Sequence, residues 1–158
     1  MCGICGQLRF DGEIVSTKSL DDMMSKLAKR GPDSKGKWFE GGVGFGHQRL
    51  SIIDLSNLGS QPMVDDLLKL TLVFNGTIYN YKALRAQLIT KGYVFFSNSD
   101  TEVIIKAYHF WGEDCVNHLD GMFAFAIWDR SSQQLFVARD RMGIKPLYFN
   151  ITPKAFTF

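Results

Sequence analysis

The sequence predicts an α+β fold in which antiparallel sheets pack on each other and helices lie outside them. Helix and strand patterns are mixed along the chain, and Phe123–Trp128 and Gln134–Ala138 predict a hairpin around the polar residues 129–132. Hairpin connections favour antiparallel pairing. Both faces of Phe123–Trp128 are apolar, so this strand is expected to be covered on both sides.

The first part of the chain predicts a strand followed by a helix. Ile4–Phe10 reads as a buried strand that the turn signal Asp11-Gly12 closes. Ser19 is expected to open the helix, and Gly31-Pro32 to end it. The apolar face of this helix, with the spacing i, i+3, i+4 and i+7, consists of Leu20, Met23, Met24 and Leu27.

The middle of the chain predicts two strands and a short helix. The strands are expected at Val43–Ile53 and Leu70–Phe74, with a polar loop containing Gly and Pro between them. The helix should follow Asn80 and place Leu84 and Leu88 on one face.

A third helix and an unfinished strand complete the pattern. Ser99 and Glu102 have the spacing of a capping box and precede an amphipathic helix that ends near Gly112. The chain closes with Ala155–Phe158, which reads as a strand just starting. Because a domain rarely ends inside an apolar strand, we expect a C-terminally truncated piece of a longer protein.

Length and charge exclude several classes of protein. The 158 residues favour one domain, and 18 basic against 16 acidic residues are too balanced to indicate nucleic-acid binding. The charge-dense stretch Lys26–Lys37 reads as a solvated helix end. No segment has the pattern of a secretory signal or of a membrane span, so a cytoplasmic protein without membrane contact is expected.

The three cysteines argue against a disulfide framework because their number is odd. Cys2 and Cys5 form a C-x-x-C, which leaves zinc binding and redox chemistry open as alternatives. Zinc normally takes four ligands, and there is neither a second C-x-x-C nor a closely spaced His pair, so no metal is expected. Cys5 and Cys115 are interpreted as small buried residues.

Cys2 follows the initiator methionine, whose removal would leave this cysteine with a free α-amino group. The pKa of an α-amine is about 7.7–8.0 and that of a thiol about 8.5. One residue would then hold both a nucleophile and a base near neutral pH. A Cys–His pair is the other covalent option, with His47, His109 and His118 as candidate bases.

Seven short motifs, in order over nearly the whole chain, carry a family resemblance. They are Met1–Ile4, Arg30–Asp33, Gly46–Asp54, Phe74–Asn80, Ser99–Glu102, Asp120–Phe125 and Ala138–Tyr148. The chain resembles the class II, or N-terminal-nucleophile, glutamine amidotransferases. Within that class, Arg49–Asp54 and Arg139–Tyr148 are most similar to the asparagine synthetase branch.

The resemblance implies hydrolysis of glutamine by acyl transfer, with Cys2 as the nucleophile and a thioester as the intermediate. The tetrahedral oxyanion needs preorganised hydrogen-bond donors. The residues that match the family's two donors are Asn75, through its side-chain amide, and Gly76, through its N–H. By local pattern alone, Asn75-Gly76 after a strand would read as a hairpin turn.

The resemblance also implies how glutamine is bound. Arg49 matches the family's ligand for the α-carboxylate and Asp100 its ligand for the α-ammonium, and Leu50 to Ile53 add backbone contacts. By themselves, Arg49 fits a surface ion pair and Asp100 a helix N-terminal acid. Thr77 stands where the family usually has Glu. Losing a charged hydrogen bond there would weaken binding by about 1–3 kcal/mol, and an altered amide substrate or reduced activity is also open.

Two further motifs carry structural expectations. Arg30 and the Gly-Pro-Asp that follows it should order a loop over the site, and Asp140 and Arg141 should form structural ion pairs or domain contacts.

At the level of the whole domain, the resemblance implies an αββα sandwich of the N-terminal-nucleophile hydrolase type, with residues 1–158 as the glutaminase domain. In full-length relatives, ammonia passes through a protected channel to a synthetase domain that uses ATP and Mg. No part of that domain is present, so no cofactor is expected for this segment. L-glutamine is the expected substrate, the acceptor is left open, and a homodimer is compatible with the sequence. The alternative is a degenerate, non-catalytic amide-binding or interaction module.

Overall fold

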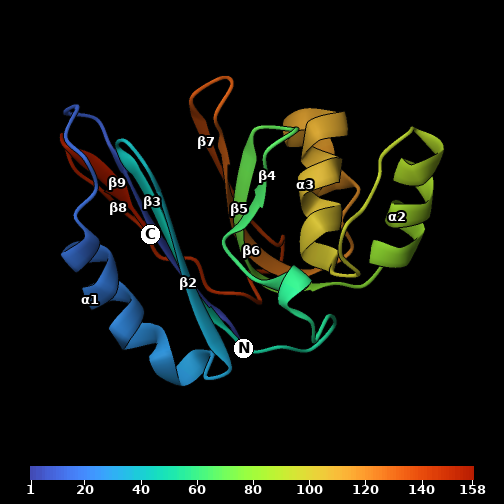
Figure 1. Ribbon diagram of the computed structural model, residues 1–158, viewed down its shortest axis with the longest axis horizontal. Coiled ribbons are helices and arrows are strands. Elements are labelled where there is room, and N and C mark those ends of the chain that lie inside the picture. Colours follow the sequence, from blue (N-terminus) through green and yellow to red (C-terminus); the bar gives the residue numbers. More distant parts are fainter.

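Two antiparallel sheets pack face to face between helices in the computed structural model, which describes residues 1–158 (Figure 1). The first sheet has the order β2 (Ser34–Glu40), β3 (Val43–Arg49), β1 (Gly3–Arg9), β9 (Ala155–Thr157) and β8 (Asn150–Ile151). The second sheet has the order β4 (Met63–Asp65), β5 (Leu70–Ile78), β6 (Gly121–Asp129) and β7 (Gln134–Arg139).

The helices form the two outer layers. Helix α1 (Thr17–Leu27) covers the first sheet, α3 (Asp100–Trp111) covers the second, and α2 (Tyr81–Thr90) packs against α3. Short 3₁₀ turns occupy 28–30, 57–59 and 112–117. The predicted αββα sandwich is therefore confirmed. None of the helices combines the length and apolarity that crossing a membrane requires.

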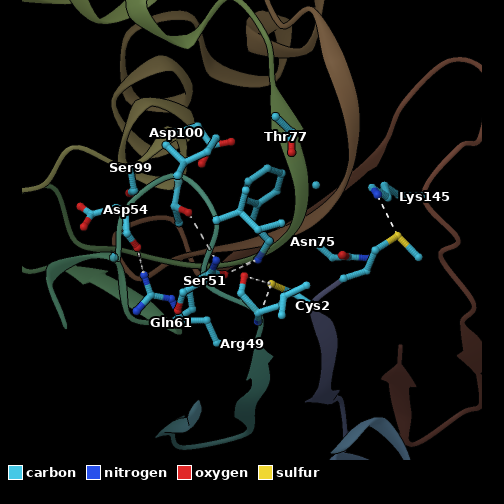
Figure 2. Close-up of a pocket in the computed structure, with 18 of the residues that line it drawn as sticks. Cys2, Arg49, Ser51, Asp54, Gln61, Asn75, Thr77, Ser99, Asp100 and Lys145 are labelled. Atoms are coloured by element: carbon cyan, nitrogen blue, oxygen red, sulfur yellow. Dashed lines mark hydrogen bonds between the residues drawn. The ribbon is translucent and has the colours of Figure 1, made fainter. Parts of the chain in front are cut away.

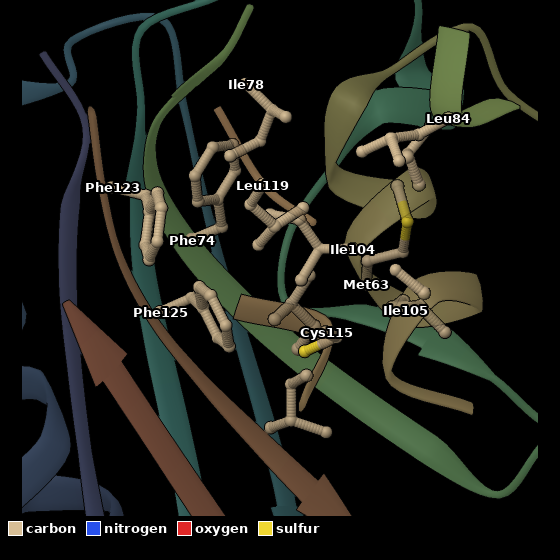
Figure 3. Close-up of a cluster of buried hydrophobic side chains, with 14 of the residues drawn as sticks. Met63, Phe74, Ile78, Leu84, Ile104, Ile105, Cys115, Leu119, Phe123 and Phe125 are labelled. Atoms are coloured by element: carbon tan, nitrogen blue, oxygen red, sulfur yellow. The ribbon is translucent and has the colours of Figure 1, made fainter. Parts of the chain in front are cut away.

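Strand β6 is covered on both faces, as its sequence predicts. Phe123, Phe125 and Ile127 belong to one large buried cluster with the inner faces of α2 and α3 (Figure 3). Ala126 and Trp128 belong to a second cluster, which lies between the two sheets and includes residues of β3 and β5. The fold thus has one core between the sheets and a larger one under the helices.

Helix α1 begins at Thr17, two residues before the expected position. Ser16 is the N-cap, and its Oγ accepts a hydrogen bond from the Ser19 N–H at 3.4 Å. The expected apolar face is confirmed, since Leu20 and Met24 are buried against the first sheet. The error in the start arises because two serines can each cap a helix, and the sequence pattern alone does not decide between them.

The interpretation of Lys26–Lys37 as a solvated helix end is wrong in its second half. Helix α1 ends at Leu27, and Ser34–Glu40 forms β2, which pairs in register with β3 along its whole length. β2 lies at the edge of its sheet, where charged residues such as Lys35 and Lys37 are tolerated. Its sequence therefore lacks the apolar run that marks the buried strands.

Two other strand boundaries differ from expectation. The strand that begins at Val43 ends at Arg49 rather than at Ile53, and the strand that begins at Leu70 continues to Ile78. The hairpin-turn reading of Asn75-Gly76 is wrong, because both residues are paired with β6. A Cβ on Gly76 would lie 2.2 Å from the Met122 carbonyl oxygen, so this position requires glycine for close approach of the backbones.

Of the two expectations for Asp140 and Arg141, the ion pairs are wrong, and the domain contacts stay a prediction. The Asp140 carboxylate accepts hydrogen bonds from the backbone N–H groups of Phe123, Ile144 and Lys145, at 2.8–3.1 Å. Arg141 donates to the Asn117 side-chain oxygen at 2.8 Å. Asp140 therefore acts as a clamp on the loop that follows β7, which sequence reasoning cannot separate from an ion pair.

The large core sets the stability of the second sheet. Phe125 is fully buried, so Phe125→Ala is expected to lower the free energy of unfolding by about 3–5 kcal/mol through lost burial and a residual cavity. Urea unfolding followed by circular dichroism measures this change. Leu67→Ala, at a side chain that is 95% exposed, is the control and should change stability by less than about 0.5 kcal/mol. Equal effects of the two substitutions would contradict the core assignment.

Candidate active site

One cavity, with a volume of about 130 Å³, collects every site residue that the sequence predicts (Figure 2). These residues are Cys2, Arg49, Leu50, Ile53, Asn75, Gly76, Thr77 and Asp100. They come from the start of β1, the end of β3 and the loop after it, the end of β5 and the start of α3. Residues far apart in the sequence thus meet at a place that both sheets border.

Strand pairing places Cys2 at this cavity. β1 is antiparallel to β3, with Gly3 opposite Gln48, so residue 2 lies next to the segment that leaves β3. The Cys2 Sγ accepts a hydrogen bond from the Leu50 N–H at 3.4 Å and lies 3.6 Å from the Leu50 carbonyl oxygen. The Arg30 Nε donates to the Cys2 carbonyl oxygen at 3.1 Å. The half-buried thiol is thus held by the Leu50 backbone, and the Cys2 backbone is held by Arg30.

The segment from Arg30 to Asp33 orders this end of the molecule, as its motif predicts. A Cβ on Gly31 would lie 2.2 Å from the Gln48 carbonyl oxygen, so the segment packs directly on β3. Asp33 accepts a hydrogen bond from the Ser51 N–H at 2.8 Å. These contacts fix the backbone on both sides of the Cys2 thiol.

Asn75 presents an amide group to the cavity. Its side chain is 3% exposed and makes no hydrogen bond within the protein, so its donors remain free for a ligand. Gly76 follows it on β5 and lines the same cavity. The Asn75 amide and the Cys2 thiol therefore face a common space.

Arg49 lies at the opposite end of the cavity and is anchored by backbone oxygens. Its guanidinium donates to the carbonyl of Ser56 at 3.0 Å and also to the carbonyl of Asp54. Two of its five N–H donors are used in this way, and three remain for a ligand. The surface ion pair that the local pattern allowed is wrong, since Arg49 is 7% exposed and contacts no carboxylate at ion-pair distance.

Asp54 connects the loop that holds Arg49 to the loop before α3. Its carboxylate accepts from the N–H and Oγ of Ser56, at 2.9 and 2.6 Å, and from the Asn98 N–H at 3.0 Å. The Ser56 hydroxyl and these N–H groups hold the pKa of Asp54 below its ordinary value. An ionised carboxylate therefore joins the two walls of the cavity.

Asp100 is the first residue of α3 and is 5% exposed. Its Oδ2 accepts a hydrogen bond from the Ile78 N–H at 3.0 Å. Burial raises the pKa of Asp100 from the ordinary 3.8 to about 6, although hydrogen bonds from backbone N–H groups oppose this shift. A cationic ligand in the cavity would favour the ionised form.

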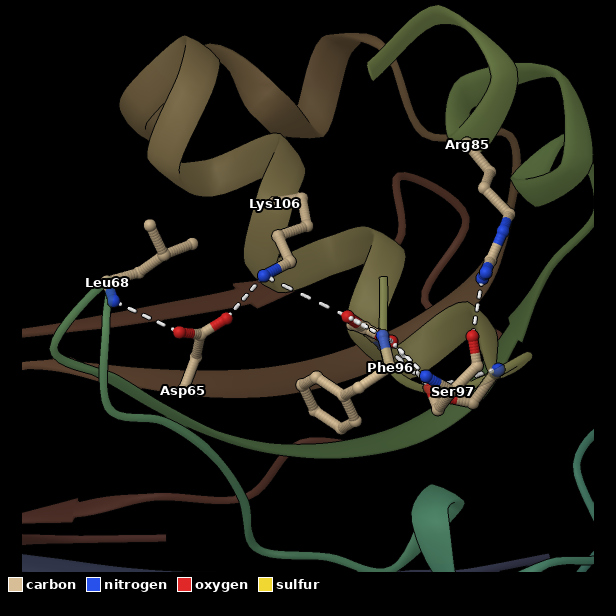
Figure 4. A network of polar contacts seen from close by, with 8 residues as sticks. Asp65, Leu68, Arg85, Phe96, Ser97 and Lys106 are labelled. Atoms are coloured by element: carbon tan, nitrogen blue, oxygen red, sulfur yellow. Dashed lines mark hydrogen bonds and ion pairs between the residues drawn. The ribbon is translucent and has the colours of Figure 1, made fainter. Parts of the chain in front are cut away.

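A buried polar network holds the first turn of α3 (Figure 4). The Ser99 Oγ accepts from the Glu102 N–H at 3.3 Å, which confirms the serine half of the predicted capping box. The other half is wrong, because the fully buried Glu102 carboxylate accepts from the N–H groups of Phe96 and Ser97 instead. The Lys106 Nζ lies 3.8 Å from Glu102 and 2.5 Å from Asp65. The orientation of Asp100 therefore rests on a network outside the cavity.

The histidine and C-x-x-C alternatives receive no support from the geometry. His47 is buried between the sheets, where its Nε2 contacts the Phe74 carbonyl oxygen at 3.2 Å, and burial lowers its pKa to about 4. It does not line the cavity. Cys5 is buried, with a pKa that desolvation raises to about 12. No three His, Cys, Asp or Glu side chains lie close enough together to hold a metal ion.

Several other residues line the cavity that sequence reasoning did not single out. They are Met1, Asp54, Gly59, Gln61, Phe74, Ser99, Thr101, Met122 and Lys145, whereas Ser51 and Ile52, which also line the cavity, belong to the expected segment Leu50 to Ile53. Gln61 accepts from the Phe74 N–H at 2.6 Å and donates to the Thr101 Oγ1 at 3.3 Å, so it links β5 to α3. Most of these residues belong to the seven motifs, and their individual roles depend on side-chain directions that a linear pattern does not give.

Comparisons with known proteins identify the family of the chain. A family model described as a glutamine amidotransferase domain matches residues 1–158. The glutamine-hydrolyzing asparagine synthetase 3 of Bacillus subtilis (strain 168) is 44% identical over 161 residues, which cover 100% of this chain and 26% of that protein. The chain thus spans about a quarter of the length of that relative.

Solved structures show the same fold. The allosteric regulatory enzyme of purine biosynthesis matches with a TM-score of 0.76 at 19% identity, over 99% of this chain and 41% of that one. The glutamine phosphoribosylpyrophosphate amidotransferase of B. subtilis matches with a TM-score of 0.62 at 23% identity, over 98% of this chain and 34% of that one. These likenesses concern the fold alone.

Asp100 is expected to reduce stability at neutral pH. Because its folded-state pKa is raised, the folded state favours the protonated acid, and this contribution is full below pH 3.8 and lost as the pH rises through about 6. Asp100→Asn should therefore raise the free energy of unfolding at pH 8 by about 1–3 kcal/mol, and by almost nothing at pH 3.5. Urea unfolding at the two pH values measures the difference. A stability gain that does not depend on pH would contradict burial of the charge as its cause.

Proposed function

The chain belongs to the glutamine amidotransferase domain family, and from this premise we propose that it hydrolyses the side-chain amide of L-glutamine to glutamate and ammonia. One observation carries the proposal. The Cys2 thiol and the unbonded amide of Asn75 border the same cavity, which is also lined by the Arg49 guanidinium and by the buried carboxylates of Asp54 and Asp100. This is the set of groups that acyl transfer on a free amino acid requires.

The proposed reaction starts once Met1 has been removed. The free α-amine of Cys2 takes the thiol proton, and the thiolate attacks the amide carbon of glutamine. The side-chain amide of Asn75 and the N–H of Gly76 stabilise the negative oxygen of the tetrahedral intermediate. The α-ammonium returns the proton to the leaving nitrogen, ammonia departs, and water hydrolyses the thioester to release glutamate.

Glutamine is held at the far end of the cavity. The three unused donors of Arg49 suit the α-carboxylate, and the buried carboxylate of Asp100 suits the α-ammonium. Leu50 and Ile53 border the cavity between these charges and the thiol. Recognition of both α-substituents would select the free amino acid over a glutamine inside a polypeptide.

Ammonia is proposed to leave by a different route from the one by which glutamine enters. A second cavity of about 320 Å³, lined mainly by apolar residues, shares Cys2 and Asn75 with the first. Its lining also includes Leu27, Leu147 and Phe158. Its apolar lining would disfavour protonation of ammonia on the way out.

The partner for this ammonia is proposed to be an ATP-dependent domain like that of asparagine synthetases. The B. subtilis relative is about four times as long as this chain and is named as a glutamine-hydrolyzing asparagine synthetase. ATP and Mg would belong to that domain and not to the residues described here. The carboxylate acceptor is left open.

Thr77 favours the second candidate function, a non-catalytic amide-binding module. It lines the cavity on the strand that carries Asn75, and it supplies a hydroxyl where the family usually has a carboxylate. The residues proposed as nucleophile, oxyanion donors and carboxylate ligand nevertheless all line the cavity. Catalysis is therefore the first proposal.

The test of the function is release of glutamate from L-glutamine by protein whose Met1 has been removed, as checked by N-terminal mass spectrometry. Cys2→Ala should reduce the rate by at least about 10³-fold, because it removes the nucleophile but keeps the oxyanion donors. Cys5→Ala, at a buried thiol, is the control and should keep most of the activity. Equal background rates in wild type and Cys2→Ala would reject the enzyme in favour of the binding module.

Thr77 sets the second test. Thr77→Glu adds a carboxylate near the ammonium end of the cavity and is expected to lower the KM for glutamine by about 5- to 100-fold, which corresponds to one charged hydrogen bond. Thr77→Gln has the same shape without the charge and should leave the KM close to that of wild type. Steady-state kinetics at pH 7.5 measure the KM of each variant. A similar KM in Thr77→Glu and Thr77→Gln would show that a negative charge at residue 77 does not affect glutamine binding.

A further inference from the structure

Lys145 places an unpaired ammonium group at the cavity. Its side chain is 5% exposed and lines the cavity together with Met1 and Cys2. Its Nζ forms no ion pair, and the single hydrogen-bond partner is the Met1 Sδ at 2.9 Å (Figure 2). Burying an ammonium without an anion carries a desolvation cost.

The backbone of Lys145 is fixed firmly. Its N–H donates to the Asp140 carboxylate at 2.9 Å, and its carbonyl accepts from the Arg139 Nε at 2.9 Å. Asp140 also accepts from two other backbone N–H groups, and its carboxylate lies beyond ion-pair distance of the ammonium. The buried Asp140 carboxylate therefore holds the backbone of Lys145 in place and does not neutralise the charge of its ammonium group.

Other charged groups around the cavity do not neutralise Lys145 either. Figure 2 shows Asp54 and Asp100 on the opposite side of the cavity from Lys145. Asp54 is bonded to Ser56 and Asn98. Arg30 is another cation near Cys2, and its Nε donates to the Cys2 carbonyl oxygen at 3.1 Å. Met1 and Cys2 line the cavity together with Lys145, and the Arg139 guanidinium donates to the Lys145 carbonyl oxygen rather than to a group in the cavity.

This inference rests on the proposed function. We infer that Lys145 is a positioning residue that acts through its charge: it keeps the freed α-amine of Cys2 in the unprotonated form that accepts the thiol proton. Removal of Met1 takes away the only hydrogen-bond partner of the Lys145 ammonium. It also moves the free α-amine of the chain from residue 1 to Cys2. Two cations in a desolvated site repel each other, so the α-amine stays neutral, and the same charge attracts the Cys2 thiolate.

The charge of Lys145 fits both halves of the proton transfer. The proton moves from the Cys2 Sγ to the α-amine and then from the α-ammonium to the departing nitrogen, and Lys145 takes no part in the transfer itself. Repulsion by Lys145 makes the α-ammonium a stronger acid, which helps it to protonate the leaving group. The negative charge on sulfur or on the oxyanion offsets the repulsion during each step.

The experiment compares Lys145→Met and Lys145→Arg with Lys154→Met, which removes the same charge from an exposed lysine. The first readout is the pH dependence of Cys2 alkylation by iodoacetamide in protein with Met1 removed. Burial raises the pKa of both other thiols, Cys5 and Cys115, to about 12, so labelling reports Cys2. The second readout is the acid limb of kcat/KM for glutamine.

Lys145→Met is expected to move the alkylation midpoint and the acid limb up by about one pH unit, which lowers kcat/KM roughly tenfold at pH 6.5. Lys145→Arg and Lys154→Met should stay close to wild type. An unchanged midpoint in Lys145→Met overturns the inference, and so does an equal shift in Lys145→Arg, which would indicate shape rather than charge. If Lys145→Met does not fold, Lys145→Gln carries the same test with the same two outcomes.

Alkylation separates this inference from the proposed function, because it needs no turnover. A midpoint shift in Lys145→Met, in a protein that releases no glutamate, would reject glutaminase activity and keep the electrostatic role of Lys145. Normal glutamate release with no midpoint shift in Lys145→Met would keep the function and reject the inference.

Discussion

The antiparallel pairing of β1 with β3 is the constraint on which the site depends. Because Gly3 lies opposite Gln48, the residue before β1 must lie beside the segment that leaves β3. One register therefore brings together the Cys2 thiol, the Leu50 backbone and the Arg49 guanidinium. A shift of this register by one residue would also turn each side chain of β1 to the opposite face of the sheet. Because Cys5 is buried against α1, such a shift is unfavourable, and the same packing therefore fixes the position of Cys2.

The second sheet supplies the other wall of the cavity and is held to the first mainly by apolar contacts. Val43 and Phe45 pack against Val73, Ala126 and Trp128 between the sheets. Beyond this core the two sheets meet at the cavity, where β5 contributes the amide of Asn75. The distance between thiol and amide is thus set by core packing rather than by any direct bond between them.

Charge is concentrated at the site at a cost to stability. Asp100 is buried with a raised pKa, Lys145 has no anionic partner, and Arg49 is satisfied by carbonyl oxygens. Each group is oriented by neighbours that do not themselves face the cavity, such as Glu102 beneath α3 and Asp140 beneath Lys145. Polar groups held in place in this way are what the proposed hydrolysis of glutamine requires.

The sequence by itself determined the fold class, most elements and the residues of the site. Strong periodic patterns identified α1, α3 and the hairpin of β6 and β7, and the ordered motifs identified eight of the residues that line the cavity. These features can be predicted from the sequence because apolar spacing and motif order depend on residues that are close together along the chain. The edge strand β2 and the continuation of β5 through Asn75-Gly76 were not predicted, because each depends on a partner strand.

Only the tertiary structure decided how the polar residues are used. Local spacing makes Asp140 an ion-pair candidate, Glu102 half of a capping box and Arg49 a surface cation, yet all three bond to backbone groups or to residues far away in sequence. The tertiary structure also brings the Lys145 side chain into contact with Met1, which is 144 residues away along the chain. Side-chain direction and burial set these roles, and both arise only when the two sheets and their helices have packed.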